Sequence, residues 1–389
     1  MRHARYLLTV GLVAALAAAT PAQAPPGTQS DGALRPRPGA NRQPQVPPPS
    51  ILDYKPRSTL VVAEQPVPRA RYPVIDVHSH QPAPISASQM ATLVQQMDAL
   101  NLGVLVNASG TSGDSLVRSV AAIRSSGHAT RMVMFANISF RDVGPGFGER
   151  AARQLEADVT AGAVGLGEIS KAFGLTARKS DGSRLTLDDP ELDPIWQTAA
   201  RLRIPVLIHT ADPQEFFAPL DHQNERWLEM ALFPERRYPP DRYPSFETLM
   251  AERDRLFRRH PNTTFIAAHL GWHANDLARL GRMFDDMPNV YGEVGAVLYD
   301  LGRQPRAAQA FLTKYQDRVL FGKDSYQPDE FPYFWRVFET GDEYFDYYRD
   351  YHAFWKLYGL ALPDDVLRKL YYENALKLMP GIPRDRFPQ

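Results

Sequence analysis

Two histidines, two positions apart, follow an apolar run near the start of the globular part of the chain. Residues 73–77 read as a short buried strand, Pro-Val-Ile-Asp-Val, and His78 and His80 come at its end. Because side chains alternate between the two faces of a strand, both imidazoles point the same way, with Asp76 one step behind them. Two imidazoles on one face can hold one side of a metal ion. Taken alone, the pair fits ordinary loop histidines equally well.

Other apolar runs farther along the chain also end at a histidine or a carboxylate. The residues at these ends are Glu168, His209, His269 and Asp324. Buried polar groups destabilise a fold unless a partner such as a metal ion satisfies them. Strand parity places Lys323 on the opposite face from Asp324, where it would pack or form an ion pair. The repeated ending therefore predicts that these acids and imidazoles share one site.

From residue 73 onward, the sequence predicts strands that alternate regularly with helices, and these elements must bring the candidate site residues together. Short β-branched runs alternate with amphipathic stretches of helical length, which is typical of βα units and a parallel sheet. We expect strands at Val74–His78, Val104–Ala108, Met132–Ile138, Ala163–Ile169, Pro205–His209, Thr264–His269, Val290–Val294 and Val319–Phe321. Helical patterns lie between them at Ser88–Leu100, Leu116–Ser125, Arg150–Thr160, Glu191–Leu202 and Phe246–Arg259. Eight such units predict a (β/α)8 TIM barrel, whose catalytic groups lie at the carboxyl ends of the strands. The alternative, a doubly wound open sheet, would need a glycine-rich phosphate loop, which the sequence lacks.

The amino-acid composition limits the partners and the catalytic or metal-binding groups that the chain can have. The 389 residues include 44 Lys+Arg and 44 Asp+Glu, so no bulk charge attracts nucleic acid or an acidic membrane. The chain has no cysteine, which excludes disulfides, thiol nucleophiles and thiolate-bound zinc. Any metal must therefore be held by histidine and carboxylate. The expected partner is a small-molecule substrate, with no nucleic acid and no membrane beyond the leader; self-association is left open.

The N-terminal residues read as a secretory leader followed by a linker. Two arginines precede an apolar stretch at 6–19, and Ala22-Gln23-Ala24 fits a cleavage site, so residues 1–24 are predicted to be a signal peptide. We therefore expect a periplasmic or secreted protein, with an uncleaved anchor as the alternative. Residues 25–50, rich in proline, are predicted to be a disordered linker. Residues 51–72 are expected to form an arm, and 73–389 the barrel with its C-terminal helices.

Two longer stretches depart from the alternation. Residues 212–244 follow the fifth strand and are rich in proline, aromatic residues and charge, so they are interpreted as a flap over the substrate or as a surface excursion. Arg226 and Arg236 would give such a flap a basic lining. Residues 331–378 are strongly aromatic and predicted to be helical, and the acidic run at 342–350 is read as one helix face.

The pattern of terminal residues resembles the amidohydrolase superfamily, and within it the amidohydrolase-related ("amidohydrolase 2") branch. The end piece at 370–378, Leu-Tyr-Tyr-Glu-Asn-Ala-Leu-Lys-Leu, also resembles that branch, and the likeness covers roughly residues 73–379. The resemblance implies that His78, His80, His209 and Asp324 hold a divalent ion. Asp324 would take the proton of a metal-bound water, and His269 would lie beside it as a further ligand or an acid–base group.

Glu168 departs from the decarboxylase-like members of that branch. The Gly167-Glu168-Ile169 turn is similar to the TatD-like metal-dependent nucleases of the superfamily, in which such a glutamate bridges two ions. On that interpretation, Glu168 bridges and His209 and His269 hold the second ion. The alternative is a glutamate that only orients a ligand histidine. Zinc is the expected metal, with manganese compatible with the same donors, and one or two ions remain open.

Several other residues are weaker candidates. Asp76 is expected to orient His78, and Glu293, at the end of the seventh strand, is a minor candidate for substrate contact. Trp272 and His273 either line the pocket or begin a helix, and Lys171 is expected at the surface. The remaining histidines considered are predicted to be solvated or structural; they are His222, His260 and His352.

Three functions fit these residues. The preferred one is an exported hydrolase that uses metal-activated water on an amide, lactone or ester. The second is a metal-dependent carboxy-lyase or hydratase acting on an unsaturated or aromatic acid. A two-ion site favours the first, and a single ion with a basic pocket favours the second. The third is a barrel that only binds ligands, against which the complete set of candidate ligands argues.

Overall fold

The computed structural model describes residues 42–352 and 355–388. The predicted leader at 1–24 and most of the predicted linker lie outside this range. The chain divides into two units, Met1–Tyr54 and Lys55–Gln389, and each is described by itself. The described part of the first unit contains no helix or strand beyond a turn, in which the Asp53 amide donates to the carbonyl of Ser50 at 3.0 Å.

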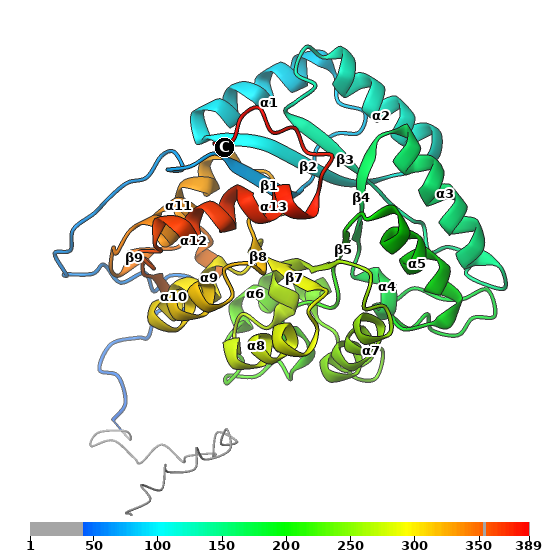
Figure 1. Cartoon of the computed structure of the whole chain (residues 1–389). Coiled ribbons are helices and arrows are strands. Elements are labelled where there is room, and N and C mark those ends of the chain that lie inside the picture. The colour runs from blue at the N-terminus through cyan, green and yellow to red at the C-terminus, as the bar shows by residue number, and fades with distance from the viewer. Residues whose placement is uncertain (1–41, 353–354, 389) are drawn as a thin grey trace, which may run out of the picture. The chain divides into compact units, whose positions relative to one another are not determined.

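The second unit is built on a parallel sheet of eight strands, each hydrogen-bonded to the next in chain order (Figure 1). The strands are β1 Val74–Ser79, β2 Leu102–Thr111, β3 Met132–Ala136, β4 Ala163–Ile169, β5 Val206–Ile208, β6 Phe265–Ala267, β7 Val290–Glu293 and β8 Val319–Leu320. Sequential order with a helix after each strand is the arrangement of a TIM barrel. The predicted fold class is confirmed, and the open doubly wound sheet is excluded.

The ring closes where β8 meets β1, and this closure is short. The Val77 amide donates to the Phe321 carbonyl at 3.0 Å, and the Asp324 amide donates to the His78 carbonyl at 2.7 Å. Ser79 and Asp324 form a parallel bridge just beyond the ends of the two strands. The closure therefore joins the chain at the histidine pair directly to the chain at Asp324. We call it the β8–β1 closure.

The helices follow from apolar spacing and from capping residues. In α1, Met90, Leu93, Val94 and Met97 are buried at helical spacing, and Ser86 and Gln89 form a reciprocal capping box at its start. The helices between the strands are α1 Ala87–Leu100, α2 Gly113–Ser125, α3 Phe147–Ala161, α4 Ala172–Leu175, α5 Asp193–Leu202, α6 Trp227–Leu232, α7 Phe246–Arg259, α8 Leu277–Asp286, α9 Leu298–Arg303 and α10 Pro305–Lys314. Apart from α6, these helices lie around the outside of the barrel (Figure 1), and the strand residues are mostly buried.

The C-terminal part packs on the barrel near its closure. It comprises α11 Phe331–Glu339, α12 Asp364–Arg368, a π-helical turn Lys369–Glu373 and α13 Asn374–Leu378. The Phe321 amide donates to the Leu370 carbonyl at 2.8 Å, and Asn374 donates to the Val319 carbonyl at 2.8 Å. These bonds tie the predicted C-terminal motif to β8.

The prediction of a helix face at 342–350 is wrong. This stretch is mainly irregular, with the short strand β9 Phe345–Asp346 paired antiparallel to β10 Lys356–Leu357. The Asp342 carboxylate is buried, where it accepts hydrogen bonds from Arg336 Nε at 2.8 Å and from the Gln65 amide at 2.8 Å. This carboxylate thus ties the segment before β1 to α11.

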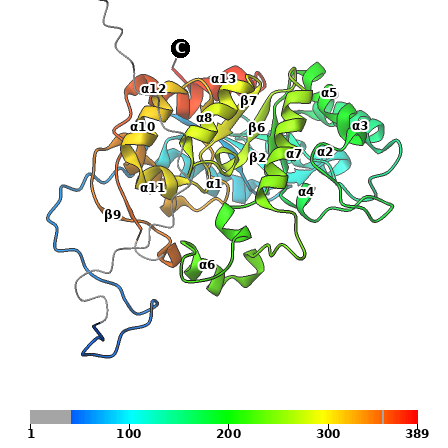
Figure 2. The same cartoon turned by 90° about the horizontal axis from the view of Figure 1, so that it is seen from below.

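The insertion at 212–244 contains α6 and two short 3-10 turns, Gln214–Phe217 and Pro234–Arg236. Figure 2 shows α6 apart from the helices α7 and α8 that cover the barrel wall. In the described part of the chain, no helix combines the length and the apolar character needed to span a bilayer.

Candidate metal centre

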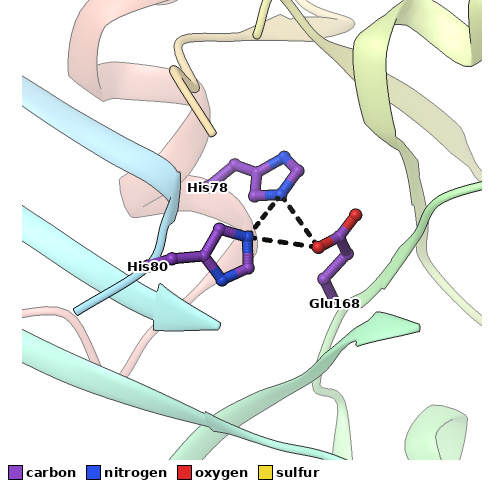
Figure 3. A group of neighbouring side chains, drawn as sticks. All are labelled: His78, His80 and Glu168. Carbon is purple, nitrogen blue, oxygen red and sulfur yellow. Dashed lines mark hydrogen bonds and ion pairs between the residues drawn. The ribbon is translucent and has the colours of Figure 1, made fainter. Parts of the chain in front are cut away.

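The histidine pair and Glu168 converge where β1 and β4 end. His78 Nε2 and His80 Nε2 lie 3.3 Å apart, and Glu168 Oε2 lies 3.4 Å from the first and 3.1 Å from the second (Figure 3). Two acceptor-capable nitrogens and a carboxylate oxygen facing one another form a possible metal-binding group. Gly167 makes this placement possible, because a Cβ there would lie 2.3 Å from the Leu207 carbonyl of the neighbouring strand.

Asp324 supplies a further oxygen beside this group. Its Oδ1 lies 3.5 Å from His80 Nε2 and 3.9 Å from His78 Nε2. Donor atoms at the corners of a tetrahedron lie about 3.3–3.4 Å apart when each is ~2.0–2.1 Å from a central zinc ion. The distances among these imidazole and carboxylate atoms, 3.1 to 3.9 Å, are close to that value. His78, His80 and Glu168 therefore form a donor group that could hold a divalent ion, and Asp324 Oδ1 lies close to both imidazoles of that group.

The second oxygen of Glu168 faces a different histidine. Oε1 lies 2.5 Å from His209 Nδ1, while Oε2 faces the histidine pair. Glu168, His209 and His269 form another possible metal-binding group. The carboxylate of Glu168 is thus positioned between two sets of imidazoles. This placement is compatible with a bridging carboxylate, and the 2.5 Å contact also fits a hydrogen bond by which Glu168 orients His209.

His209 is backed by a buried carboxylate that the sequence analysis did not single out. Asp212 Oδ1 lies 3.6 Å from His209 Nε2, and Asp212 Oδ2 accepts hydrogen bonds from Lys171 Nζ at 2.6 Å and Tyr238 Oη at 2.5 Å. Lys171 is half-exposed, but it is bound to Asp212 and does not simply project into solvent. Through Tyr238, the insertion at 212–244 is anchored behind the centre.

His269 begins a left-handed turn after β6. His269, Leu270, Gly271 and Trp272 all have φ between 53° and 60°. Its Nδ1–H donates to the Gly295 carbonyl at 2.8 Å, so Nε2 keeps its lone pair. The ring lies 4.5 Å from that of His209 and 4.6 Å from that of Trp272, centroid to centroid. Trp272 therefore packs on the centre, while His273 is buried away from it beside Arg253.

The residue that orients His78 is Glu293, not Asp76. Glu293 Oε1 lies 3.1 Å from His78 Nδ1 and accepts the His269 backbone N–H at 2.6 Å. Glu293 is fully buried behind both histidines and does not line the cavity beside the centre. Asp76 instead accepts the backbone amides of His78 at 3.1 Å and Lys323 at 3.0 Å, across the β8–β1 closure.

The electrostatics of the centre favour positive charge. Burial lowers the pKa of His78, but the carboxylates of Glu168 and Glu293 outweigh this and raise it well above its ordinary value. Burial also opposes a charged His209, whereas Asp212 and Glu168 raise its pKa to about 9. Although burial alone would raise the pKa of Glu168, the neighbouring imidazoles lower it below its ordinary range. The same negative charges would stabilise a metal cation bound among these carboxylates.

A cavity of about 970 Å³ opens beside the centre, and His80 and Glu168 line part of it. The rest comes from the end of β2 and from the chain that follows β2, β3 and β4. Polar lining residues include Ser109, Asn137 and Ser170, and the charged ones beyond Glu168 are Arg141, Asp142 and Arg178. The volume is in the range of small-molecule sites.

The sequence profile of the family described as Amidohydrolase matches residues 68–380. The chain belongs to the amidohydrolase family. This membership places it in a superfamily of metal-dependent hydrolases and lyases. No functionally curated protein matches this amidohydrolase significantly in sequence.

Solved structures share the fold at low sequence identity. An uncharacterized TIM-barrel protein from Bordetella bronchiseptica is 15% identical, covers 79% of this chain and 99% of its own, and has a TM-score of 0.50. A dihydroorotase from Campylobacter jejuni is 13% identical over 80% of this chain and 85% of its own, with a TM-score of 0.44. A zinc-bound amidohydrolase from Burkholderia multivorans is 15% identical. The match covers 79% of this chain and 98% of that protein, with a TM-score of 0.43. At these identities, the likeness concerns the barrel alone.

The flap arginines of this amidohydrolase do not form a basic pocket. Arg226 Nη1 and Arg236 Nη1 both pair with Glu229, at 2.7 and 2.6 Å. Neither belongs to the lining of the 970 Å³ cavity, and nor does any other described residue of 212–244. The two arginines of the insertion are therefore paired with Glu229 of the same insertion. The interpretation of the insertion as a substrate flap is not supported at this cavity.

The remaining predicted residues lie as follows. Lys323 points away from the centre, donating to Glu330 Oε2 at 2.5 Å and packing on the Phe331 ring, as strand parity predicted. His222 is exposed, and the other two histidines are paired with acids, His260 with Asp193 at 3.0 Å and His352 with Glu229 at 3.3 Å.

Proposed function

We propose that this amidohydrolase is a metal-dependent hydrolase acting on an amide, lactone or ester bond of a small molecule. The observation that carries the proposal is the position of Glu168, whose two oxygens face the pair His78 and His80 on one side and His209 on the other. A carboxylate shared in this way fits two ions, and a two-ion site favours attack by water.

The proposed roles follow from the contacts of each side chain. His78, His80, Glu168 and Asp324 would hold one ion, and Glu168, His209 and His269 a second. Divalent ions in such a site lower the pKa of bound water to ~7 and polarise a carbonyl. Asp324, whose carboxylate is one-third exposed, is positioned to accept the proton of the attacking water. His269 is buried, and its Nε2 keeps a lone pair because Nδ1 carries the proton. This nitrogen is therefore suited to bind a metal ion or to act as an acid–base group.

A carboxy-lyase is the second candidate, because the cavity beside the centre carries two arginines that are not ion-paired among the described residues. Arginine binds carboxylates well, so an acidic substrate fits this wall. The two candidates share the same ligands and differ in the products. Reaction in ¹⁸O-labelled water separates them: incorporation of the label into the product supports hydrolysis, and release of carbon dioxide without it supports the lyase.

Metal quantitation on the wild type and on Glu168→Ala tests the bridging role. We expect two divalent ions per wild-type chain and a loss of at least one in Glu168→Ala. Glu149→Ala, at an exposed position on α3, is the matched control and should keep both ions. An unchanged metal content in Glu168→Ala would limit Glu168 to orienting His209 and remove the support for a two-ion hydrolase.

We also propose that the protein is exported, on the strength of the leader predicted at residues 1–24. Expression of the full chain in a Gram-negative host, followed by fractionation and N-terminal sequencing, tests this. We expect periplasmic protein beginning at Pro25. Protein retained in the cytoplasm with Met1 intact would contradict the proposal.

A further inference from the structure

The two ring nitrogens of His209 face different carboxylates. Nδ1 lies 2.5 Å from Glu168 Oε1, and Nε2 lies 3.6 Å from Asp212 Oδ1. Nε2 is buried and has no hydrogen-bond partner among residues 42–352 and 355–388. A buried ring nitrogen without a partner is destabilising, and a shift of about 0.5 Å would bring it within hydrogen-bonding distance of Asp212. Asp212 is therefore the acceptor that can fix the ring proton on Nε2.

Asp212 is buried, yet it belongs to none of the candidate metal-binding groups of the described residues. Its second oxygen, Oδ2, accepts hydrogen bonds from Lys171 Nζ at 2.6 Å and from Tyr238 Oη at 2.5 Å. Burial and the neighbouring Asp212 raise the pKa of the Tyr238 hydroxyl, so this group keeps its proton and remains a donor. These two donors hold Oδ2 and leave Oδ1 facing His209.

Tyr238 stands near the far end of the insertion at 212–244, and the insertion itself fixes its position. The Tyr238 amide donates to the Phe216 carbonyl at 2.9 Å, and its ring packs on Phe217 at 4.9 Å and on Tyr243 at 5.1 Å, centroid to centroid. The insertion does not line the cavity beside the centre. It reaches the centre instead through the carboxylate behind His209.

We propose that Asp212 is a positioning residue for His209 and that the insertion holds it in place through Tyr238. With its proton fixed on Nε2, His209 presents the lone pair of Nδ1 to the centre. The inference rests on the proposed function, because it concerns a ligand of the same metal centre. It assigns the insertion to the retention of a metal ion.

Competition with a chromophoric chelator, performed on the purified holoenzyme, measures the affinity of each ion. Asp212→Asn should weaken one of the two ions by about 10–100-fold, the effect typical of residues that orient metal-binding histidines, and leave the other unchanged. Tyr238→Phe removes only the hydroxyl and should weaken the same ion roughly tenfold, because a hydrogen bond to a charged group is lost. Tyr243→Phe, which removes a hydroxyl from the ring packed on Tyr238, is the matched control and should keep both affinities.

The visible absorption of the cobalt-substituted protein separates positioning from general stability. Asp212→Asn and Tyr238→Phe should change this spectrum, while the melting temperature of metal-free Tyr238→Phe stays close to that of the metal-free wild type. Unchanged affinities in both variants overturn the inference, and so does an equal loss at both ions with an unchanged spectrum. The same comparison applies if the wild type holds a single ion, because His209 is a candidate ligand in either case. These results leave the proposed function standing, whereas a wild type that holds no divalent ion overturns both.

Discussion

Glu293 lies wholly buried between the two histidines that it orients. One oxygen meets His78 Nδ1 and the His269 backbone N–H, and the other accepts the Gly295 amide at 2.6 Å. Gly322 leaves room for it, because a Cβ there would lie 2.3 Å from Glu293 Oε2. Burial alone would raise the pKa of Glu293, but His78 and these N–H donors lower it to about 2. The ionised carboxylate thus fixes which nitrogen His78 presents to the centre.

Glu293→Gln should weaken metal binding without unfolding the barrel. The amide is similar in size, but its NH₂ group must face an N–H donor, so at least one of the hydrogen bonds is lost. Residues that orient metal-binding histidines typically contribute about 10–100-fold to metal affinity. Metal affinity is measured by competition with a chromophoric chelator. Glu339→Gln changes a buried carboxylate that pairs with Arg71 and Tyr371 and belongs to none of the candidate ligand groups, so it should keep the affinity. Equal affinity in Glu293→Gln and wild type would contradict the assigned role.

At the scale of elements, the turn after β6 is held in a costly conformation. Left-handed backbone costs about 1–2 kcal/mol for each residue other than glycine, and His269, Leu270 and Trp272 all adopt it. Arg253 on α7 donates to the Gly271 carbonyl at 2.8 Å, and Trp272 Nε1 donates to the Ala211 carbonyl at 3.2 Å. Such strain persists where surrounding contacts fix it, commonly at functional sites.

His273 makes the stability of this turn depend on pH. It is buried and faces Arg253 Nη2 at 3.1 Å, and burial together with Arg253 lowers its pKa to about 2. The unfolded chain, with an ordinary pKa of ~6.5, therefore binds one more proton between these values, so the free energy of unfolding falls as the pH falls. Between about pH 7.5 and about pH 5 this loss is about 2 kcal/mol.

Replacing His273 by glutamine should remove that part of the acid sensitivity. Urea unfolding of His273→Gln at the two pH values should show a decrease about 2 kcal/mol smaller than in the wild type. His222→Gln changes an exposed histidine and should behave as the wild type does. The assignment of His273 as a neutral buried group is wrong if His273→Gln and wild type lose equal stability on acidification.

The strands could be predicted closely because each is a short, mostly buried apolar run, and a parallel barrel follows from their alternation with helices. The convergence of His78, His80, Glu168 and Asp324 was also predictable, since carboxyl ends of parallel strands meet at one rim. The contact of Glu293 with the His78 ring was not predicted, because nothing local in the sequence shows that Glu293 faces inward behind His78. The arginines of the cavity wall sit in loops without periodicity, and the sequence does not show that they lack partners.

At the scale of the whole molecule, the candidate metal centre lies at the β8–β1 closure, the junction where the barrel has a single bridge in place of a strand ladder. The β8–β1 closure rests on few backbone bonds, supplemented by Asp76, which accepts amides from both sides. His78 and His80 stand on one side of it, and Asp324 stands on the other. Glu168 comes from the far side of the ring, near the end of β4. Because the candidate ligands come from both sides of the β8–β1 closure, a bound ion would cross-link the two sides.

Removal of the metal should therefore lower global stability and loosen the β8–β1 closure first. A ligand present at ~100 times its dissociation constant stabilises the folded state by about 2.7 kcal/mol, so dialysis against a chelator should lower the melting temperature by several degrees. Hydrogen exchange should accelerate most at the amides of Val77 and Asp324, which close the ring, and much less at the β5–β6 ladder. Restoring zinc should reverse both changes. If the demetallated protein instead keeps its melting temperature and exchanges uniformly, the closure is stable on its own and the ion contributes chemistry alone.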